Sequence, residues 1–263
     1  MTRTALSVGL LWWVVATTSL ASPQTTIGMT AAELVSKITR EWPKSSSYRV
    51  RATLTRSATG SGARDVRQLL IKRHRDRTSS KVSFEQLWPK DGEGRTLVLD
   101  NTPDRPPQGF VYDAGAVTRL TSRHFTDRFF GSDLLIDDLV ERFWSWPAPR
   151  LVGEESIGEY RCGIVEFRPP AAASYSRITA WLSPDLALGL RFQQFGPDNK
   201  PVKKIEGYRI LKVGDRWAAG IVTVEPADGK SRTVLEATKY ESDPALSVDD
   251  FTAEAIRRSA ARR

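Results

Sequence analysis

Alternation of apolar and polar residues is the main pattern along most of the chain. The first such segment places arginine and threonine between a series of apolar residues, which are Tyr48, Val50, Ala52 and Leu54. A period of two is typical of a strand with one buried face. Similar segments follow up to residue 240, separated by short turns rich in Gly, Pro, Asp and Asn. The pattern predicts about eleven strands, and strands joined by short turns are expected to pair antiparallel.

Three segments depart from this period and predict helices. Thr30 and Glu33 have the spacing of a capping box, and apolar residues follow at helical intervals as far as Pro43. Residues 247–258 predict a short helix near the end of the chain. The third segment, residues 129–146, lies in the middle of the chain, between two series of strands.

The middle segment predicts one amphipathic helix. Ser132 and Asp133 are suitable N-caps, because their side-chain oxygens can accept hydrogen bonds from the first helical turn. Apolar residues then recur every four positions, at Leu135, Leu139 and Phe143, before Pro147 ends the helix. We expect this helix to cover an apolar face of the sheet.

The first 21 residues have the features of a secretory signal peptide. Arg3 precedes an uncharged, largely apolar run from Ala5 to Leu20, and cleavage is expected after Ala21. An uncleaved N-terminal anchor is the alternative. Cleavage would leave residues 22–263 as a single domain that is long enough to bury a core. The chain has one cysteine, Cys162, so an internal disulfide is excluded and a bacterial periplasm is the expected location.

The chain carries a net charge of +8. A basic chain can bind nucleic acid, but export makes anionic lipid headgroups or an acidic protein surface the better candidates. The alternative is that the excess arginine is solvated surface, which the arginine-rich segments 64–77 and 257–263 favour.

The sequence lacks a convincing catalytic or metal-binding motif. His74 and His124 are the only histidines, and they are not at metal-ligand spacing with Cys162. Ser132 is better interpreted as a cap than as a nucleophile, and Cys162 as a small buried apolar residue. Asp133, Asp137 and Asp138 could hold a cation, but they lack the calcium-loop pattern. We expect neither an enzyme nor a bound cofactor or metal.

The middle segment resembles a family signature. Phe130-Gly131-Ser132-Asp133 followed by Asp137-Asp138-Leu139 is similar to the F-x-G-S-D-F-x-x-x-D-L signature of the outer-membrane lipoprotein-sorting family, the LolA-like proteins. Gly131, Ser132, Asp133 and Asp138 match it as structural positions. Leu134 stands where the family has an aromatic residue. The flanking elements Phe110-Val111-Tyr112, Gly153-Glu154-Glu155 and Tyr160-Arg161-Cys162 follow the family order, and the resemblance extends from Thr30 to the C-terminus.

This resemblance implies a fold and a function. The implied fold is mainly β, an open, incomplete antiparallel β-barrel with a helical lid over a hydrophobic cavity. The implied function is that of a monomeric periplasmic carrier for the acyl chains of lipids or lipoproteins, active in lipoprotein sorting and outer-membrane biogenesis. Its expected partners are that cargo, an inner-membrane lipid or lipoprotein exporter and, transiently, the membrane. A lipid-sensing regulatory protein of similar fold is one alternative, and a hydrolase using Ser132 or Cys162 is another.

The predicted cavity and lid residues are bulky side chains in segments of strong alternation or helical spacing. They are Leu34, Ile38, Val50, Leu54, Phe84, Leu97, Leu99, Phe110, Tyr112, Leu135, Leu139, Phe143, Trp181, Leu190, Phe192 and Trp217.

Overall fold

The computed structural model describes residues 27–40, 46–76, 79–101, 105–170, 173–214 and 216–261. Its strands are β1 (Ser46–Ala58), β2 (Arg64–Arg75), β3 (Ser80–Trp88), β4 (Thr96–Asp100), β5 (Gln108–Asp113), β6 (Ala116–Arg119), β7 (Arg150–Ile157), β8 (Tyr160–Phe167), β9 (Arg177–Ser183), β10 (Leu188–Phe195), β11 (Pro201–Val213), β12 (Arg216–Pro226) and β13 (Ser231–Ser242). The predicted signal peptide lies outside the described residues.

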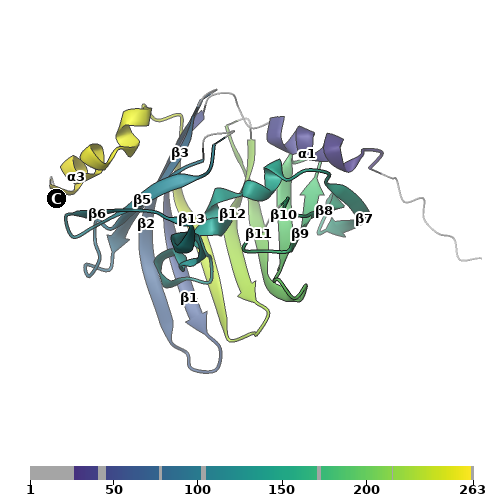
Figure 1. Ribbon diagram of the computed structural model, residues 1–263, viewed down its shortest axis with the longest axis horizontal. Coiled ribbons are helices and arrows are strands. Elements are labelled where there is room, and N and C mark those ends of the chain that lie inside the picture. The colour runs from purple at the N-terminus through teal and green to yellow at the C-terminus, as the bar shows by residue number, and fades with distance from the viewer. Residues whose placement is uncertain are drawn as a thin grey trace, which may run out of the picture.

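All these strands belong to one curved antiparallel sheet (Figure 1). The strand order is β6-β5-β4-β3-β2-β1-β13-β12-β11-β10-β9-β8-β7, so β6 and β7 are the two edges and do not pair with each other. The predicted open, incomplete antiparallel barrel is therefore confirmed.

The described part of the chain has thirteen strands, where the sequence pattern predicts about eleven. Strand β7 follows the prolines that end the middle segment, and the sequence pattern does not predict it. Most of its side chains are exposed, and Leu151 and Val152 are among them. An edge strand with so little buried surface lacks the alternation by which the other strands are detected.

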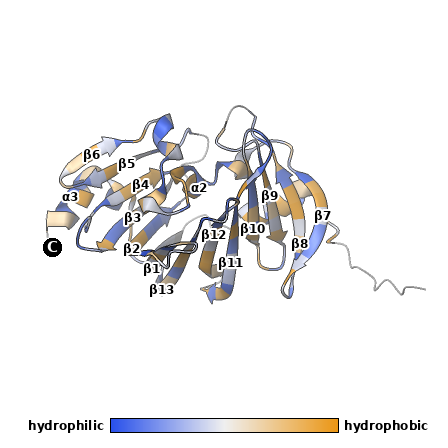
Figure 2. Ribbon diagram, turned by 90° about the horizontal axis from the view of Figure 1, so that it is seen from below, coloured by the Kyte–Doolittle hydropathy of each residue, from blue (hydrophilic) through white to orange (hydrophobic). Residues whose placement is uncertain are grey.

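The order of the strands explains the position of the middle segment. From β1 the chain builds the sheet outward to β6, crosses to the other edge at β7, and returns strand by strand until β13 pairs with β1. The crossing segment, residues 122–146, therefore has to span the concave side of the sheet. Helix α2 (Ile136–Val140) lies within the curve of the sheet in Figure 2.

The crossing segment is not the single helix that the sequence predicts. It consists of three 3₁₀ turns, η1 (Ser122–Thr126), η2 (Phe129–Gly131) and η3 (Arg142–Ser145), and the five-residue helix α2. Ser132 and Asp133 do not cap a helix, because Leu135 is the N-cap of α2 and the Asp138 carboxylate accepts its N–H at 2.7 Å. Glu141 ends α2 in a left-handed conformation with φ 54°.

Helix α1 (Ala31–Arg40) confirms the predicted capping box. The Glu33 carboxylate accepts the Thr30 N–H at 2.8 Å, and Thr30 Oγ1 accepts the Glu33 N–H at 3.2 Å. Leu34 and Ile38 are fully buried against β8 and β9. Gly163 permits this approach, because a Cβ at that position would lie 2.5 Å from a Leu34 methyl carbon.

Helix α3 (Ala253–Ala261) and the 3₁₀ turn η4 (Val248–Phe251) cover the other face of the sheet. Phe251 and Ile256 pack with Val98, whose neighbours Leu97 and Leu99 point to the concave side. The sheet thus has apolar clusters on both faces.

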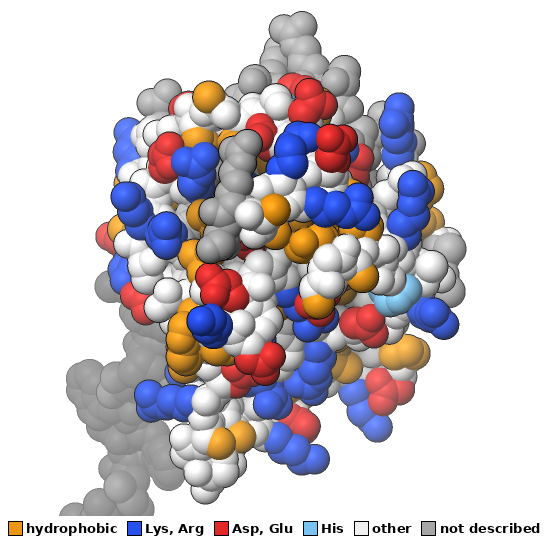
Figure 3. All heavy atoms as spheres, turned by 90° about the vertical axis from the view of Figure 1, so that its left-hand side faces the viewer, with side chains coloured by type: hydrophobic (Ala, Val, Ile, Leu, Met, Phe, Trp, Pro, Cys, Tyr) orange, Lys and Arg blue, Asp and Glu red, His pale blue; other side chains and the backbone are white. Residues whose placement is uncertain are grey.

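Charges of both signs cover the outside of the protein. Figure 3 shows the face on the left of Figure 1, where basic and acidic side chains are interspersed around small apolar patches. Among the helices of the described ranges, none has the length and apolar character needed to cross a membrane.

Candidate functional site

A large cavity lies between the concave face of the sheet and the crossing segment. Its volume is about 1000 Å³, at the upper end of the range of small-molecule sites. Its floor comes from strands near the middle of the sheet, where one period-two face of each strand is apolar. The apolar floor residues include Val50, Ala52, Ile71, Val82, Phe84, Ile205, Val222, Leu235 and Ala237.

The roof of the cavity comes from the crossing segment. Leu134, Leu139, Glu141 and Phe143 line the cavity from above. Phe143 also packs edge-on against Phe167 and Phe192, with ring centroids 5.3 and 5.6 Å away. Phe143 is therefore part of the protein core as well as part of the cavity wall, whereas Leu139 is only partly buried.

Asp133 fixes the start of the crossing segment to β1 and β13. Its side chain is 1% exposed and accepts hydrogen bonds from Arg56 at 3.0 Å and from Ser231 and Thr233 at 2.8 Å. Burial opposes the charge of this carboxylate, but these hydrogen bonds outweigh it and lower the pKa of Asp133. The roof is thus attached to the first and last strands of the chain, which pair with each other in the interior of the sheet.

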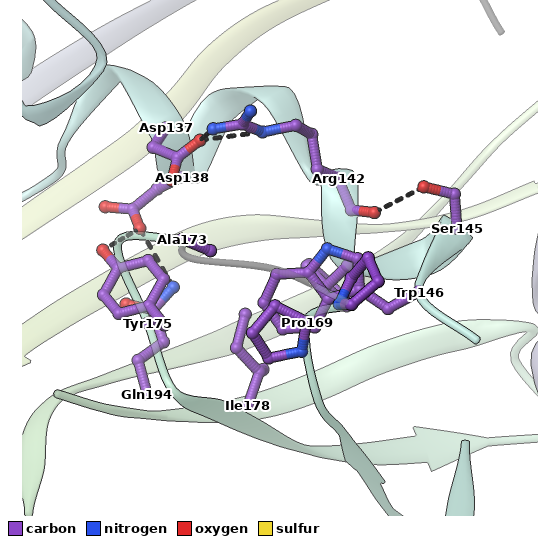
Figure 4. Close-up of a pocket in the computed structure, with 12 residues that line it drawn as sticks. Asp137, Asp138, Arg142, Ser145, Trp146, Pro169, Ala173, Tyr175, Ile178 and Gln194 are labelled. Carbon is purple, nitrogen blue, oxygen red and sulfur yellow. Dashed lines mark hydrogen bonds and ion pairs between the residues drawn. The ribbon is translucent and has the colours of Figure 1, made fainter. Parts of the chain in front are cut away.

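Asp138 fixes the roof to the opposite half of the sheet. Its carboxylate is 2.5 Å from Lys203 Nζ and accepts hydrogen bonds from Tyr175 at 2.6 Å and Gln194 at 2.9 Å. The Tyr175 hydroxyl donates to this carboxylate, and burial together with the carboxylate charge raises the pKa of Tyr175. Figure 4 shows Asp138 directed toward Tyr175 and Gln194. Two buried carboxylates thus hold the roof at two separate points.

A smaller pocket of about 280 Å³ lies beside the Asp138 cluster. Trp146, Pro169 and Ile178 form its apolar wall, and Arg142 pairs with Asp137 at its upper side (Figure 4). Asp138, Phe143 and Gln194 line both this pocket and the large cavity. These three side chains therefore form the partition between the two spaces.

The large cavity is not apolar throughout. Arg73, Arg75 and Arg216 line one end of it, together with Tyr48 and Tyr240. Two of these arginines belong to the segment 64–77, whose composition favours solvated surface, yet Arg73 and Arg75 line the cavity. Arg73 and Arg75 alternate with Lys72 and His74 and therefore lie on the same face of β2 as Ile71. This alternation is the sequence signal by which they could have been predicted as cavity residues.

Six of the sixteen predicted lipid-binding residues line the large cavity: Val50, Phe84, Leu139, Phe143, Phe192 and Trp217. Leu54, Leu97 and Leu99 lie in the core on the same face of the sheet, and Leu34, Ile38 and Leu135 lie in the cluster around α1.

The other four predicted residues also do not line the cavity, and they belong to two further apolar clusters. Phe110 and Tyr112 pack with α3 and η4, and Trp181 packs with Cys162 on the face opposite to Ala180 and Leu182. Leu190 lies in the same cluster as Trp181, at a register shift between Gly189 and Arg191. Gly131, the remaining signature position, has a φ of 74° in η2, a conformation that favours glycine.

The candidate nucleophiles are buried away from the cavity lining. Ser132 is 1% exposed, and its hydroxyl accepts the Leu134 N–H at 3.2 Å. Burial raises the pKa of the Cys162 thiol to about 11, which disfavours the thiolate. The described residues contain no group of three His, Cys, Asp or Glu side chains placed to bind a metal ion.

The sheet and its crossing segment define a LolA-like fold. A crystal structure of a DUF1329 family protein from Desulfovibrio piger superposes with a TM-score of 0.76 at 21% identity, covering 86% of this chain and 98% of that one. An outer membrane lipoprotein-sorting protein domain from Vibrio parahaemolyticus gives a TM-score of 0.78 at 15% identity, with coverages of 87% and 98%. A LolA superfamily protein from Nitrosomonas europaea gives 0.69 at 14% identity, with coverages of 86% and 99%.

These structures confirm the fold that the resemblance found in the sequence implies. A family model described as "Uncharacterized protein" matches residues 80–258, and the chain belongs to this family. A comparison with curated proteins finds no match.

Proposed function

We propose that this protein is a non-enzymatic periplasmic carrier. It binds the acyl chains of lipids or lipoproteins in the large cavity and takes part in lipoprotein sorting or lipid transport to the outer membrane. The single observation that carries this proposal is the cavity of about 1000 Å³ with a largely apolar lining. Transfer of an acyl chain from water into such a space is favourable by about 0.8 kcal/mol per buried CH₂.

The position of the roof supports transport rather than catalysis. The crossing segment is a tethered connection between the two edges of the sheet, so it can cover a bound chain without being part of the sheet hydrogen bonding. The nucleophiles considered from the sequence, Ser132 and Cys162, do not line the cavity. The size of the cavity suits an acyl chain that is bound and released unchanged.

The proposed location follows from the leader sequence and the fold. Residues 1–21 have the pattern of a cleaved signal peptide, and residues 22–263 would then form the mature carrier as one domain. The neighbours include one named as an outer membrane lipoprotein-sorting protein domain. An inner-membrane exporter is the proposed donor of the cargo.

The test is binding of a fluorescent fatty-acyl probe to delipidated protein purified from the periplasm. Saturable binding is expected, and native mass spectrometry of the protein before delipidation is expected to detect co-purified lipid. In the variant Ala237→Trp, an indole fills part of the cavity floor and is expected to reduce binding at least tenfold. The variant Val152→Trp adds the same group to the exposed edge strand β7, where Val152 is 50% exposed, and should bind like the unmodified protein.

Two results would overturn the proposal. One is the absence of both saturable probe binding and co-purified lipid. The other is an equal loss of binding in the two tryptophan variants, which would show that the probe does not enter the cavity.

A further inference from the structure

The basic end of the large cavity is built from four adjacent strands, β2, β1, β13 and β12. Arg73 lies opposite Tyr48 of β1. Arg75 lies two residues further along β2, so the Cα atoms of the two arginines are about 6.6 Å apart. Arg216 is at the start of β12. All three side chains line the cavity and are partly buried.

Tyrosine side chains border these arginines. The rings of Tyr48 and Tyr240 are 5.8 Å apart and also line the cavity. Burial opposes the charge of Arg73, but its interactions with Tyr48 and Glu141 outweigh this and raise the pKa of Arg73. This end therefore combines cationic groups with phenol hydroxyls, which can donate hydrogen bonds to an anion.

The positive charges are close enough to influence one another. Burial lowers the pKa of Arg75, and the charges of Arg73 and Arg216 lower it further. An arrangement in which like charges are held together in a partly desolvated space becomes more favourable when an anion binds between them.

The acidic groups at this end are fewer than the basic groups. Glu141 faces Arg73 and Arg75 from the roof, and Asp243 lines the cavity beside Tyr240. Among the described residues, the three arginines thus stand against these two carboxylates. Asp138, which also lines the cavity, is bound to Lys203.

Glu141 is a weak internal counterion. The residue is solvent-exposed, but desolvation of the carboxyl by the surrounding protein raises its pKa above the ordinary value in spite of the two arginines. A ligand phosphate carries more charge and offers more acceptor oxygens than one carboxylate, and it matches the planar guanidinium groups better.

From this geometry we infer that the cavity binds an amphiphile with a phosphate headgroup. The phosphate lies among Arg73, Arg75 and Arg216, and the acyl chains run along the apolar floor toward Val50 and Leu235. The inference rests on the proposed carrier function and adds to it the chemical class and the orientation of the cargo. Glu141 holds the arginines until the phosphate takes its place.

The test compares two ligands that share one chain. Lyso-phosphatidic acid with an oleoyl chain and mono-oleoylglycerol differ in the phosphate, and each is titrated against a fluorescent acyl probe bound to the delipidated mature protein. We expect lyso-phosphatidic acid to bind at least tenfold more tightly, as charge-assisted hydrogen bonds would produce. In the variants Arg75→Gln and Arg216→Gln this ratio should fall to below threefold, because only lyso-phosphatidic acid has a phosphate whose contacts are lost.

The matched control is Arg49→Gln. Arg49 lies on β1 next to Tyr48, on the opposite face of the strand, where it pairs with Glu241. This variant should keep the full preference for the phosphate. Urea denaturation of each variant shows whether the variant is folded.

Three outcomes would overturn the inference. Equal affinities of the unmodified protein for the two ligands would overturn it and leave the carrier function intact, whereas failure of both ligands to bind would refute the carrier function itself. Inorganic phosphate that binds as tightly as lyso-phosphatidic acid would identify a site for free anions. A preference that survives in both arginine variants would place the phosphate elsewhere.

Discussion

Lys203 Nζ lies 2.5 Å from Asp138 Oδ2, and both side chains are buried, with exposures of 7% and 1%. The two residues are 65 positions apart in sequence. Asp138 belongs to the roof of the cavity and Lys203 to the sheet below it. The same carboxylate accepts hydrogen bonds from Tyr175 and Gln194, so one acidic group connects the roof to three neighbouring parts of the fold.

Replacement of Asp138 by Asn tests this connection. The amide keeps the size of the side chain but leaves the Lys203 charge buried without a counterion. Removal of one partner of a buried ion pair typically lowers the free energy of unfolding by about 3–5 kcal/mol. We expect a loss of that order for Asp138→Asn, measured by urea denaturation of the mature protein.

The control for Asp138→Asn is Glu236→Gln, which removes one partner of the exposed pair between Arg209 and Glu236. Exposed ion pairs contribute about 0–1 kcal/mol, so this variant should be close to the unmodified protein. Similar losses in the two variants would show that Asp138 and Lys203 do not hold the roof in solution.

The sequence identifies the general fold because its signals are local. The capping box of Thr30 and Glu33 and the alternation in β1 depend on residues within one or two turns of each other. The roles of Asp133 and Asp138 cannot be obtained in this way. Their position near a helix start indicates capping, but their side chains bind Thr233 and Lys203, which are far away in the sequence.

The cavity lining was predictable in part for a related reason. A period of two defines two faces of each strand, and the prediction assigned the face with the bulkier apolar side chains to the cavity. This assignment is correct for Val50 in β1 and Phe84 in β3. The assignment fails for Phe110 in β5 and Trp181 in β9, because these bulky side chains belong to apolar clusters on the opposite face of the sheet. Which face looks into the cavity depends on the curvature of the whole sheet.

The stability of the protein is expected to decrease in acid through Glu206. Burial opposes ionisation of this carboxyl group, but Lys204, Tyr208 and Arg191 bind the carboxylate and lower its pKa from 4.5 to about 2. A depressed pKa stabilises the folded protein above the pKa of the unfolded chain, and this contribution is lost as the pH falls toward 2. The free energy of unfolding should therefore decrease between about pH 4.5 and pH 2.

The variant Glu206→Gln isolates this contribution. It should be less stable than the unmodified protein at pH 7, and urea denaturation curves of the two proteins should converge near pH 2. A stability difference that is constant from pH 7 to pH 2 would assign the effect to packing and not to the charge.

The thiol of Cys162 should be unreactive in the folded protein. Its side chain is fully buried, and its pKa is raised to about 11. Labelling with Ellman's reagent at pH 8 should therefore proceed only after addition of urea, because the thiolate is the reactive species. Rapid labelling of one thiol per native chain would contradict this expectation and return Cys162 to the list of candidate nucleophiles.

Leu139 and Phe143 should respond differently to truncation, although both line the cavity. Phe143 is 8% exposed and packs against Phe167 and Phe192, so Phe143→Ala should lower the free energy of unfolding by about 3–5 kcal/mol.

Leu139 is only partly buried, and part of its side chain faces the cavity. The variant Leu139→Ser should therefore weaken acyl-probe binding by about tenfold, as expected for the loss of one or two buried methylene contacts, with a smaller loss of stability than in Phe143→Ala. Probe titration and urea denaturation of both variants provide the comparison. If Leu139→Ser lost stability but kept its affinity for the probe, Leu139 would be an ordinary core residue and the bound chain would lie elsewhere in the cavity.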